Sequence, residues 1–150
     1  ADHVSSEIFA PKTLTPTGNT QIICLIYTPD GSLRGVNRSV AQQIDLMPTL
    51  LGLTGYDRPY FAFGRDVLRE TDREPMVSNY AGGTYQGITD SLVLFFDGER
   101  TLSAYLRSDT LQKNDISGIR TPALEAAERD LKARLQQYYR HVKQKDYLAE

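Results

Sequence analysis

The stretch QIDLMPTLLGLTG, at residues 43–55, limits the fold of this chain more than any other segment. Asp45 stands before an apolar run, where its carboxylate can accept hydrogen bonds from the free N–H groups of a helix's first turn. Pro48 then lies in that first turn, where its missing N–H has no intrahelical partner. Gly55 can adopt the left-handed conformation that ends a helix. The stretch therefore predicts a short, largely buried helix over residues 45–55, roughly two to three turns long.

A second apolar segment precedes this helix. Residues 21–27 (QIICLIY) are continuously apolar and rich in β-branched side chains, and the turn sequence Pro29-Asp30-Gly31 follows. Such a run predicts a strand buried on both faces, as in sheets that carry helices on either side. Cys24, the only cysteine, lies in this run and is expected to be a buried thiol rather than a nucleophile. Strand, connection and helix make one α/β unit within residues 1–74.

A different pattern begins at residue 75. Segments 76–79, 84–89, 91–96 and 101–108 are rich in strand-forming residues, and Asp97-Gly98 between two of them is a strong hairpin signal. These segments predict a small antiparallel sheet.

Thr121-Pro122 then marks a helix start. Apolar residues recur every three or four positions after it, at Leu124, Ala127, Leu131, Leu135, Tyr138 and Val142. We expect this C-terminal helix to close over the sheet, within a second region of residues 75–150 that packs against residues 1–74 as one body.

Charge and histidine content limit the chemistry. The net charge of −2 gives no electrostatic reason to expect nucleic acid or an anionic membrane as a partner. Of the two histidines, His141 near the end of the predicted helix is interpreted as a solvated side chain without a chemical role. The other, His3, follows Asp2. A carboxylate and an imidazole are both good ligands for a divalent cation, so Asp2-His3 is the candidate metal-binding pair.

Taken in order, the first half of the chain resembles one superfamily of enzymes. The pattern D-x-x-P-T-L-L-x-L-x-G, here from Asp45 to Gly55, is similar to a helix near the C-terminal end of the sulfatase and alkaline-phosphatase core. With Asp2-His3, the apolar run and Gly64, the order of motifs looks most like the lipoteichoic acid synthase and phosphoglycerol transferase branch. The resemblance implies an alkaline-phosphatase-like α/β core in residues 1–74, then a small antiparallel sheet with a closing helix in residues 75–150. The family usually has proline where Cys24 stands.

The resemblance also implies a role for the Asp-His pair. In that branch the pair ends a core strand and binds a catalytic divalent metal, commonly Mn²⁺, with Mg²⁺, Ca²⁺ and Zn²⁺ as alternatives. Asp2 and His3 would therefore be ligands of a metal site that is incomplete in this chain. The metal polarises a phosphoryl or sulfuryl oxygen and lowers the pKa of a threonine nucleophile. In the family that threonine precedes the Asp-His pair, so residues 1–150 alone are expected to be inactive.

The sequence thus leads to one main hypothesis and two alternatives. The main one is the C-terminal fragment of a metal-dependent phosphoryl or sulfuryl ester transferase or hydrolase, phosphoglycerol-transferase-like, in the periplasm or at the cell surface, with the whole protein anchored in the inner membrane. Its expected partners are the missing N-terminal part of the same protein and a second copy, bound through an exposed sheet edge. The alternatives are a soluble sulfatase, although sulfatases more often have Asp-Asn at this pair, and a non-catalytic α+β binding or assembly module.

Overall fold

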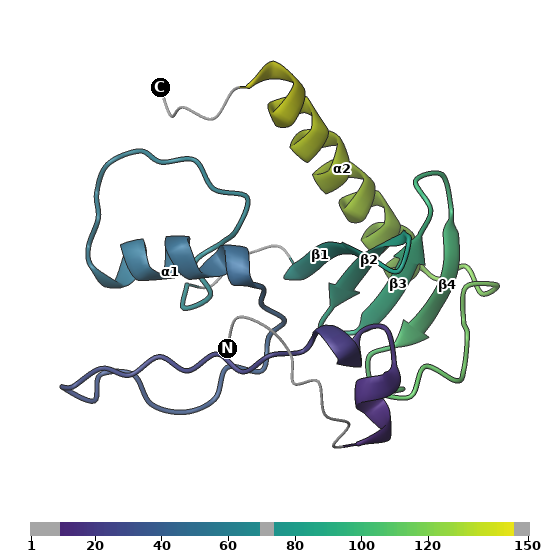
Figure 1. Ribbon diagram of the computed structural model, residues 1–150, viewed down its shortest axis with the longest axis horizontal. Helices are drawn as coiled ribbons and strands as arrows, with labels where there is room; N and C mark the ends of the chain where they lie inside the picture. Colours follow the sequence, from purple (N-terminus) through teal and green to yellow (C-terminus); the bar gives the residue numbers. More distant parts are fainter. Residues whose placement is uncertain (1–9, 70–73, 146–150) are drawn as a thin grey trace.

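A computed structural model describes residues 10–69 and 74–145 of the chain (Figure 1). The chain first forms short 3₁₀ turns and one helix, then an antiparallel sheet, and then a long helix. The bounds are η1 (Pro11–Leu14), η2 (Gly18–Thr20), η3 (Gln43–Asp45), α1 (Leu46–Leu53), β1 (Met76–Ala81), β2 (Thr84–Thr89), β3 (Leu92–Phe96), β4 (Thr101–Leu106) and α2 (Pro122–Gln144). The predicted mixture of helix with a small antiparallel sheet and a C-terminal helix is confirmed.

The sheet is a simple meander in the order β1-β2-β3-β4, with every pair antiparallel. Gly82 and Gly83 turn the chain between β1 and β2, both with positive φ (+61° and +82°), a conformation that glycine adopts without strain. At the predicted Asp97-Gly98 turn, the Asp97 carboxylate accepts hydrogen bonds from the amides of Glu99 and Arg100. The hairpin predicted from Asp-Gly is therefore confirmed.

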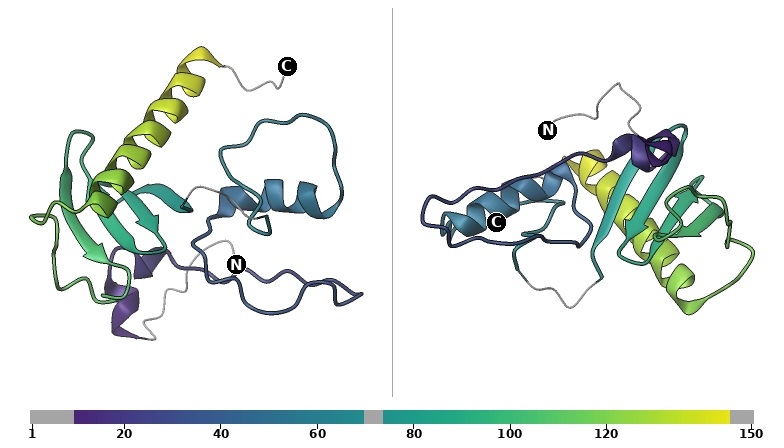
Figure 2. Two further views of the ribbon diagram at one scale, coloured as in Figure 1. Left: turned by 180° about the vertical axis from the view of Figure 1, so that it is seen from behind. Right: turned by 90° about the horizontal axis from the view of Figure 1, so that it is seen from below.

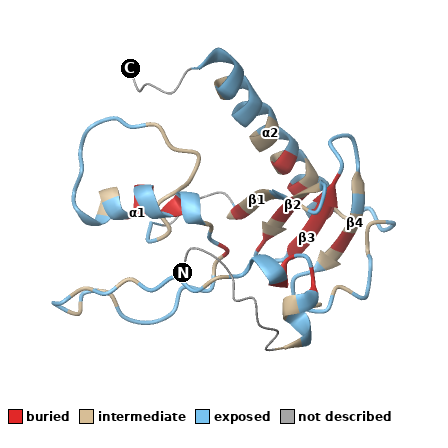
Figure 3. Cartoon of the chain, in the orientation of Figure 1, coloured by how far each residue is buried: buried red, intermediate tan, exposed pale blue. Residues whose placement is uncertain are grey.

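The buried core lies between the sheet and the first half of α2 (Figure 3). As predicted, Thr121 begins this helix, because its hydroxyl accepts a hydrogen bond from the Leu124 amide. The helix crosses β1, β2 and β3, and it buries three of its predicted apolar residues there. The core comprises Met76, Leu92, Leu94, Phe96, Ala104, Leu124, Ala127 and Leu131. Leu135 is partly buried against this core, whereas Tyr138 and Val142 continue the same stripe but are exposed, so burial of the stripe decreases toward the end of the helix.

Residues 21–27 do not form the strand that the sequence predicts. They run without regular secondary structure away from the sheet, beside α1 (Figures 1 and 2). Cys24 is exposed, and Leu25 keeps 82% of its surface. The expectation of a strand buried on both faces, with a buried thiol, is therefore wrong for this structure. The physical reason is that, among the described residues, no strand lies beside this segment to pair with it.

Helix α1 forms where the sequence predicts a helix, but not as a buried one. Pro48 lies in its first turn, and Gly55 has the expected left-handed conformation with φ +69°. The Asp45 carboxylate makes no cap to α1 and instead accepts the amides of Gln42 and Arg65. Within α1 only Pro48 and Thr49 are buried, Leu51 is half-buried, and Leu46, Leu50 and Leu53 are exposed. The largely buried helix is therefore wrong, because nothing in the described residues covers its apolar side.

Candidate functional site

The predicted metal ligands, Asp2 and His3, lie outside the described residues. Within residues 10–69 and 74–145, no group of three or more His, Cys, Asp or Glu side chains could hold a metal ion. The metal site therefore stays a prediction that involves Asp2, His3 and residues beyond those described.

What the described residues present instead is a set of exposed apolar side chains in the N-terminal half. It is spread over residues 21–27, helix α1 and the loop that follows α1 (Figures 1 and 3). We call it the uncovered apolar surface. It consists of Ile23, Leu25, Tyr27, Leu46, Met47, Leu50, Leu53, Tyr56 and Tyr60. Exposed apolar groups on this scale mark interaction surfaces in soluble proteins.

Buried polar contacts hold α1 with this surface outward. Asp45 is only 5% exposed, and its two carboxylate oxygens accept the amides of Gln42 (2.9 Å) and Arg65 (2.8 Å). The Thr49 hydroxyl, fully buried, donates to the Asp45 carbonyl oxygen and accepts from the Val67 amide. These bonds fasten the loop after α1 to the inner side of the helix. The apolar side is thus left on the outside, the reverse of an ordinary amphipathic helix.

Hydrogen bonds also fasten the N-terminal half to the sheet. Asp90, between β2 and β3, accepts from the Ser39 hydroxyl and from the Val40 amide, both at 2.8 Å. Arg107 forms an ion pair with the same carboxylate at 3.1 Å. On the open edge of β1, the amide of Ser78 donates to the Gln42 side-chain oxygen. These contacts between the two halves are hydrogen bonds and an ion pair, and none of them involves a side chain of the uncovered apolar surface.

An aromatic contact joins the loop after α1 to the end of α2. The ring of His141 lies 4.7 Å from that of Phe61 and 5.8 Å from that of Phe63, and Phe63 also contacts Tyr138. His141 is half-buried. The interpretation of His141 as a solvated side chain is therefore wrong. The helix position of His141 does not reveal this contact, because its partners come from a loop about 80 residues earlier in the chain.

A second feature is an open cavity of about 650 Å³ beside the first half of α2. It is lined by Glu99, Arg100, Thr101, Ser117, Arg120, Leu124, Glu125, Glu128, Arg129 and Lys132. Its charges are largely paired: Lys132 contacts Glu128 at 2.6 Å, and Arg120 contacts Glu125 at 3.8 Å. The hydrogen bond from Lys132, and then the one from Thr101, lower the pKa of Glu128. Paired charges of both signs do not favour one class of ligand, so we assign this cavity no chemistry.

Two further observations concern membrane-spanning helices and similarity to known proteins. None of the helices within residues 10–69 and 74–145 is long and apolar enough to cross a membrane. Comparison of the chain with protein-family models, with curated proteins and with solved structures found no match.

Proposed function

We propose that this chain is the C-terminal part of a metal-dependent phosphoryl or sulfuryl ester transferase or hydrolase of the sulfatase-like superfamily, closest to its phosphoglycerol transferase branch. The observation that carries the proposal is the uncovered apolar surface, together with the sequence pattern that lies within it. The alkaline-phosphatase-like core is part of the proposal. So are the extracytoplasmic location and the membrane anchor of the whole protein.

The sequence pattern supports the proposal residue by residue. Pro48 fits a first helical turn, and Gly55 fits a left-handed helix end. A side chain at Gly64 would collide with the carbonyl oxygen of Ile44, so the loop needs glycine there. Pro48, Gly55 and Gly64 thus each have a structural reason, which supports a fold-level likeness. Fold-level likeness alone does not establish a reaction, so the chemistry depends on Asp2 and His3.

The uncovered apolar surface supports the proposal energetically. Fully burying one large aliphatic side chain contributes roughly 1.5–3 kcal/mol. Leu25 and Leu50 are 82% and 54% exposed, and seven further side chains of the surface are exposed as well. In the proposed enzyme, the preceding part of the core covers them: residues 21–27 become a buried strand, and α1 packs on that sheet. Both sequence expectations that fail in this structure would then hold in the whole protein.

In the proposed enzyme, Asp2 and His3 are two of the ligands of a divalent metal, with Mn²⁺ as the first candidate. The metal would supply Lewis-acid chemistry at a phosphoryl or sulfuryl oxygen. The remaining ligands and the threonine nucleophile belong to the preceding part of the protein. The isolated chain is accordingly inactive, and it binds metal weakly. Calorimetric titration with Mn²⁺ checks this, and tight stoichiometric binding by residues 1–150 alone would show that other ligands exist.

The main test is an assay of the longer protein that the coding sequence upstream of Ala1 would specify. We expect a metal-dependent release of product from a phosphodiester, and a slower reaction with a sulfate ester. Asp2→Asn and His3→Gln should each abolish this activity, whereas Asp57→Asn, in an exposed loop position, should leave it unchanged. Preference for the sulfate ester would favour the soluble sulfatase. A start codon directly before Ala1 would instead favour the non-catalytic module.

Cys24 gives a test of the covered surface that does not depend on activity. Its thiol is exposed in this structure, so a thiol reagent should label the native 150-residue chain at the rate of the unfolded chain. In the longer protein the proposed strand is buried, and labelling should become at least roughly 100-fold slower because it requires local opening. Equal labelling of Cys24 in both proteins would contradict the proposed core even if the longer protein is active.

A further inference from the structure

Positive charge gathers in the second half of α2, although the whole chain has a net charge of −2. Residues 131–145 contain five Lys or Arg residues and no Asp or Glu, and the next carboxylates are Asp146 and Glu150. Two of the five cations, Lys132 and Arg134, pair with carboxylates one turn earlier on the helix. The other three are exposed and have no ion pair within the described residues; they are Arg140, Lys143 and Lys145.

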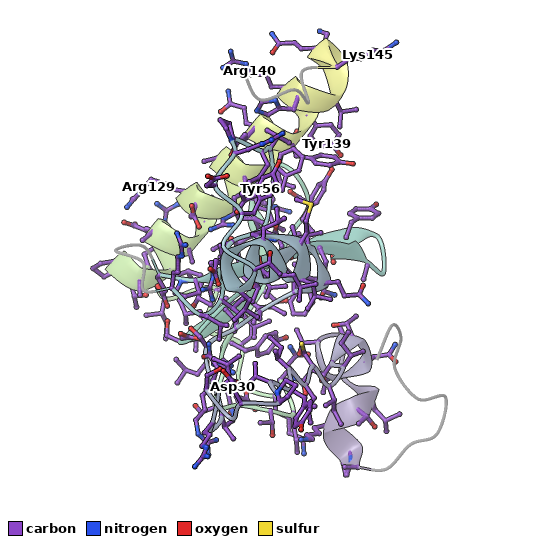
Figure 4. All side chains as sticks on the ribbon, turned by 90° about the vertical axis from the view of Figure 1, so that its left-hand side faces the viewer. Asp30, Tyr56, Arg129, Tyr139, Arg140 and Lys145 are labelled. Atoms are coloured by element: carbon purple, nitrogen blue, oxygen red, sulfur yellow. The ribbon has the colours of Figure 1, made fainter. Side chains whose placement is uncertain are left out.

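The three cations lie where α2 has left the sheet. The last turns of the helix extend beyond the sheet at one end of the molecule (Figure 1). Figure 4, turned by 90°, shows Arg140, Tyr139 and Lys145 along the same terminal part of the helix, with Arg129 far from them. Tyr139 is 53% exposed, and its neighbour Tyr138 is nearly as exposed. The end of α2 therefore combines cations with exposed aromatic rings.

We infer that this end of α2 docks onto an anionic lipid membrane surface. Each Lys or Arg near such a surface contributes about 1 kcal/mol, which is about fivefold in the partition coefficient. Tyrosine rings are amphipathic and prefer the headgroup region, while long basic side chains keep their charge at the phosphates. The dipole of α2 is a reason for cations in its last turn. It does not explain the two tyrosines beside them. Tyr138 contacts Phe63 and the Tyr139 hydroxyl lies 2.6 Å from that of Tyr85, yet the two residues keep 47% and 53% of their surface exposed next to the cations. The inference is independent of the proposed function.

The chain contains no tryptophan, so Tyr139→Trp introduces a single fluorescent reporter. We expect this variant to bind vesicles of phosphatidylcholine with phosphatidylglycerol, with a blue shift of the indole emission, and to bind pure phosphatidylcholine vesicles far more weakly. Raising the salt to about 1 M, where the Debye length is about 3 Å, should reverse binding. We expect the partition coefficient to fall about 100-fold in the triple variant Arg140→Gln, Lys143→Gln and Lys145→Gln.

A matched control removes the same charge elsewhere. Arg100, Arg120 and Arg129 are exposed and lie near the β3–β4 turn and the first half of α2. Their joint replacement by Gln should leave vesicle binding unchanged. Equal loss in both triple variants would overturn the inference, because binding would then follow net charge alone. Equal binding to both vesicle types would overturn it as well. So would tight binding of soluble polyphosphate with no shift on vesicles, which would indicate a polyanion site instead of a membrane site.

Discussion

The main-chain amide of Arg65 donates a 2.8 Å hydrogen bond to the buried carboxylate of Asp45, which joins the loop after α1 to the turn before it. The same carboxylate accepts the Gln42 amide at 2.9 Å. One side chain thus satisfies two backbone donors that come from opposite ends of a 24-residue segment. A buried donor without a partner is costly, so this carboxylate should determine whether α1 keeps its place.

Asp45→Ala removes the acceptor from both donors. Leaving a buried polar group unsatisfied costs about 1–3 kcal/mol, so we expect the free energy of unfolding to fall by roughly 2–4 kcal/mol. Asp45→Asn keeps one oxygen and should cost about half as much. Urea denaturation followed by circular dichroism measures both. A loss below about 0.5 kcal/mol for Asp45→Ala would mean that water satisfies the two amides.

Gly64 and Gly55 are expected to resist substitution for different reasons: steric collision at Gly64 and a left-handed backbone at Gly55. A Cβ at Gly64 would collide with the Ile44 carbonyl oxygen and lie 2.8 Å from the Asp45 amide nitrogen. Backbone atoms cannot yield as a flexible side chain does, so Gly64→Ala should destabilise the chain by roughly 3 kcal/mol.

At Gly55 the Cβ would meet nothing within 4 Å, but φ is +69°. Gly55→Ala should therefore cost only the left-handed penalty of about 1–2 kcal/mol. Thermal denaturation of the two variants measures the difference, and we expect Gly64→Ala to have the lower midpoint. Equal midpoints would show that the Gly64 loop rearranges to accept the methyl group.

The sequence predicts the second region of the chain well because its signals are local. The Asp97-Gly98 turn and the Thr121-Pro122 helix start depend on residues adjacent in sequence, and the structure has both. The end of α2 is different, since Tyr138 and His141 contact the loop at Phe61 and Phe63. No short-range pattern predicts a contact between residues so far apart in the chain.

The burial predicted for the N-terminal half is wrong for a related reason. Hydrophobicity at Leu25 and Leu50 predicts that these side chains are buried, but it does not say which atoms bury them. In this structure both side chains are exposed, so the prediction that they are buried is wrong here, and nothing among the described residues covers them. The candidate metal ligands Asp2 and His3 are likewise named by a motif alone. Their geometry depends on chain segments that the described residues do not contain.

The pH dependence of stability should show the contribution of Glu128. Its pKa is lowered from the ordinary value of 4.5, first by the hydrogen bond from Lys132 and then by the one from Thr101. A carboxyl group with a depressed folded-state pKa stabilises the fold above its unfolded pKa, and this stability is lost as the pH falls through the folded value. The Glu128 contribution should therefore be complete near neutral pH and disappear below about 4.5.

Glu128→Gln measures that contribution. We expect it to lower the free energy of unfolding by about 1 kcal/mol at neutral pH, with the difference from the parent chain shrinking toward zero in acid. Glu125→Gln serves as the control on the same helix, because Glu125 is 48% exposed and its ion pair with Arg120 is long, at 3.8 Å. Its effect should stay below about 0.5 kcal/mol at every pH. A Glu128→Gln difference that does not change with pH would assign the effect to packing.

The uncovered apolar surface should make the isolated 150-residue chain self-associate, because two copies can shield each other's exposed side chains. We expect light scattering to give particles larger than a monomer at tens of micromolar. Leu25→Gln with Leu50→Gln should shift the chain toward monomer at little cost in stability, since both side chains are already exposed. Leu102→Gln is the matched control, because Leu102 on β4 is 45% exposed but lies outside this surface. A strictly monomeric parent chain, or an equal response to Leu102→Gln, would show that the surface does not drive association.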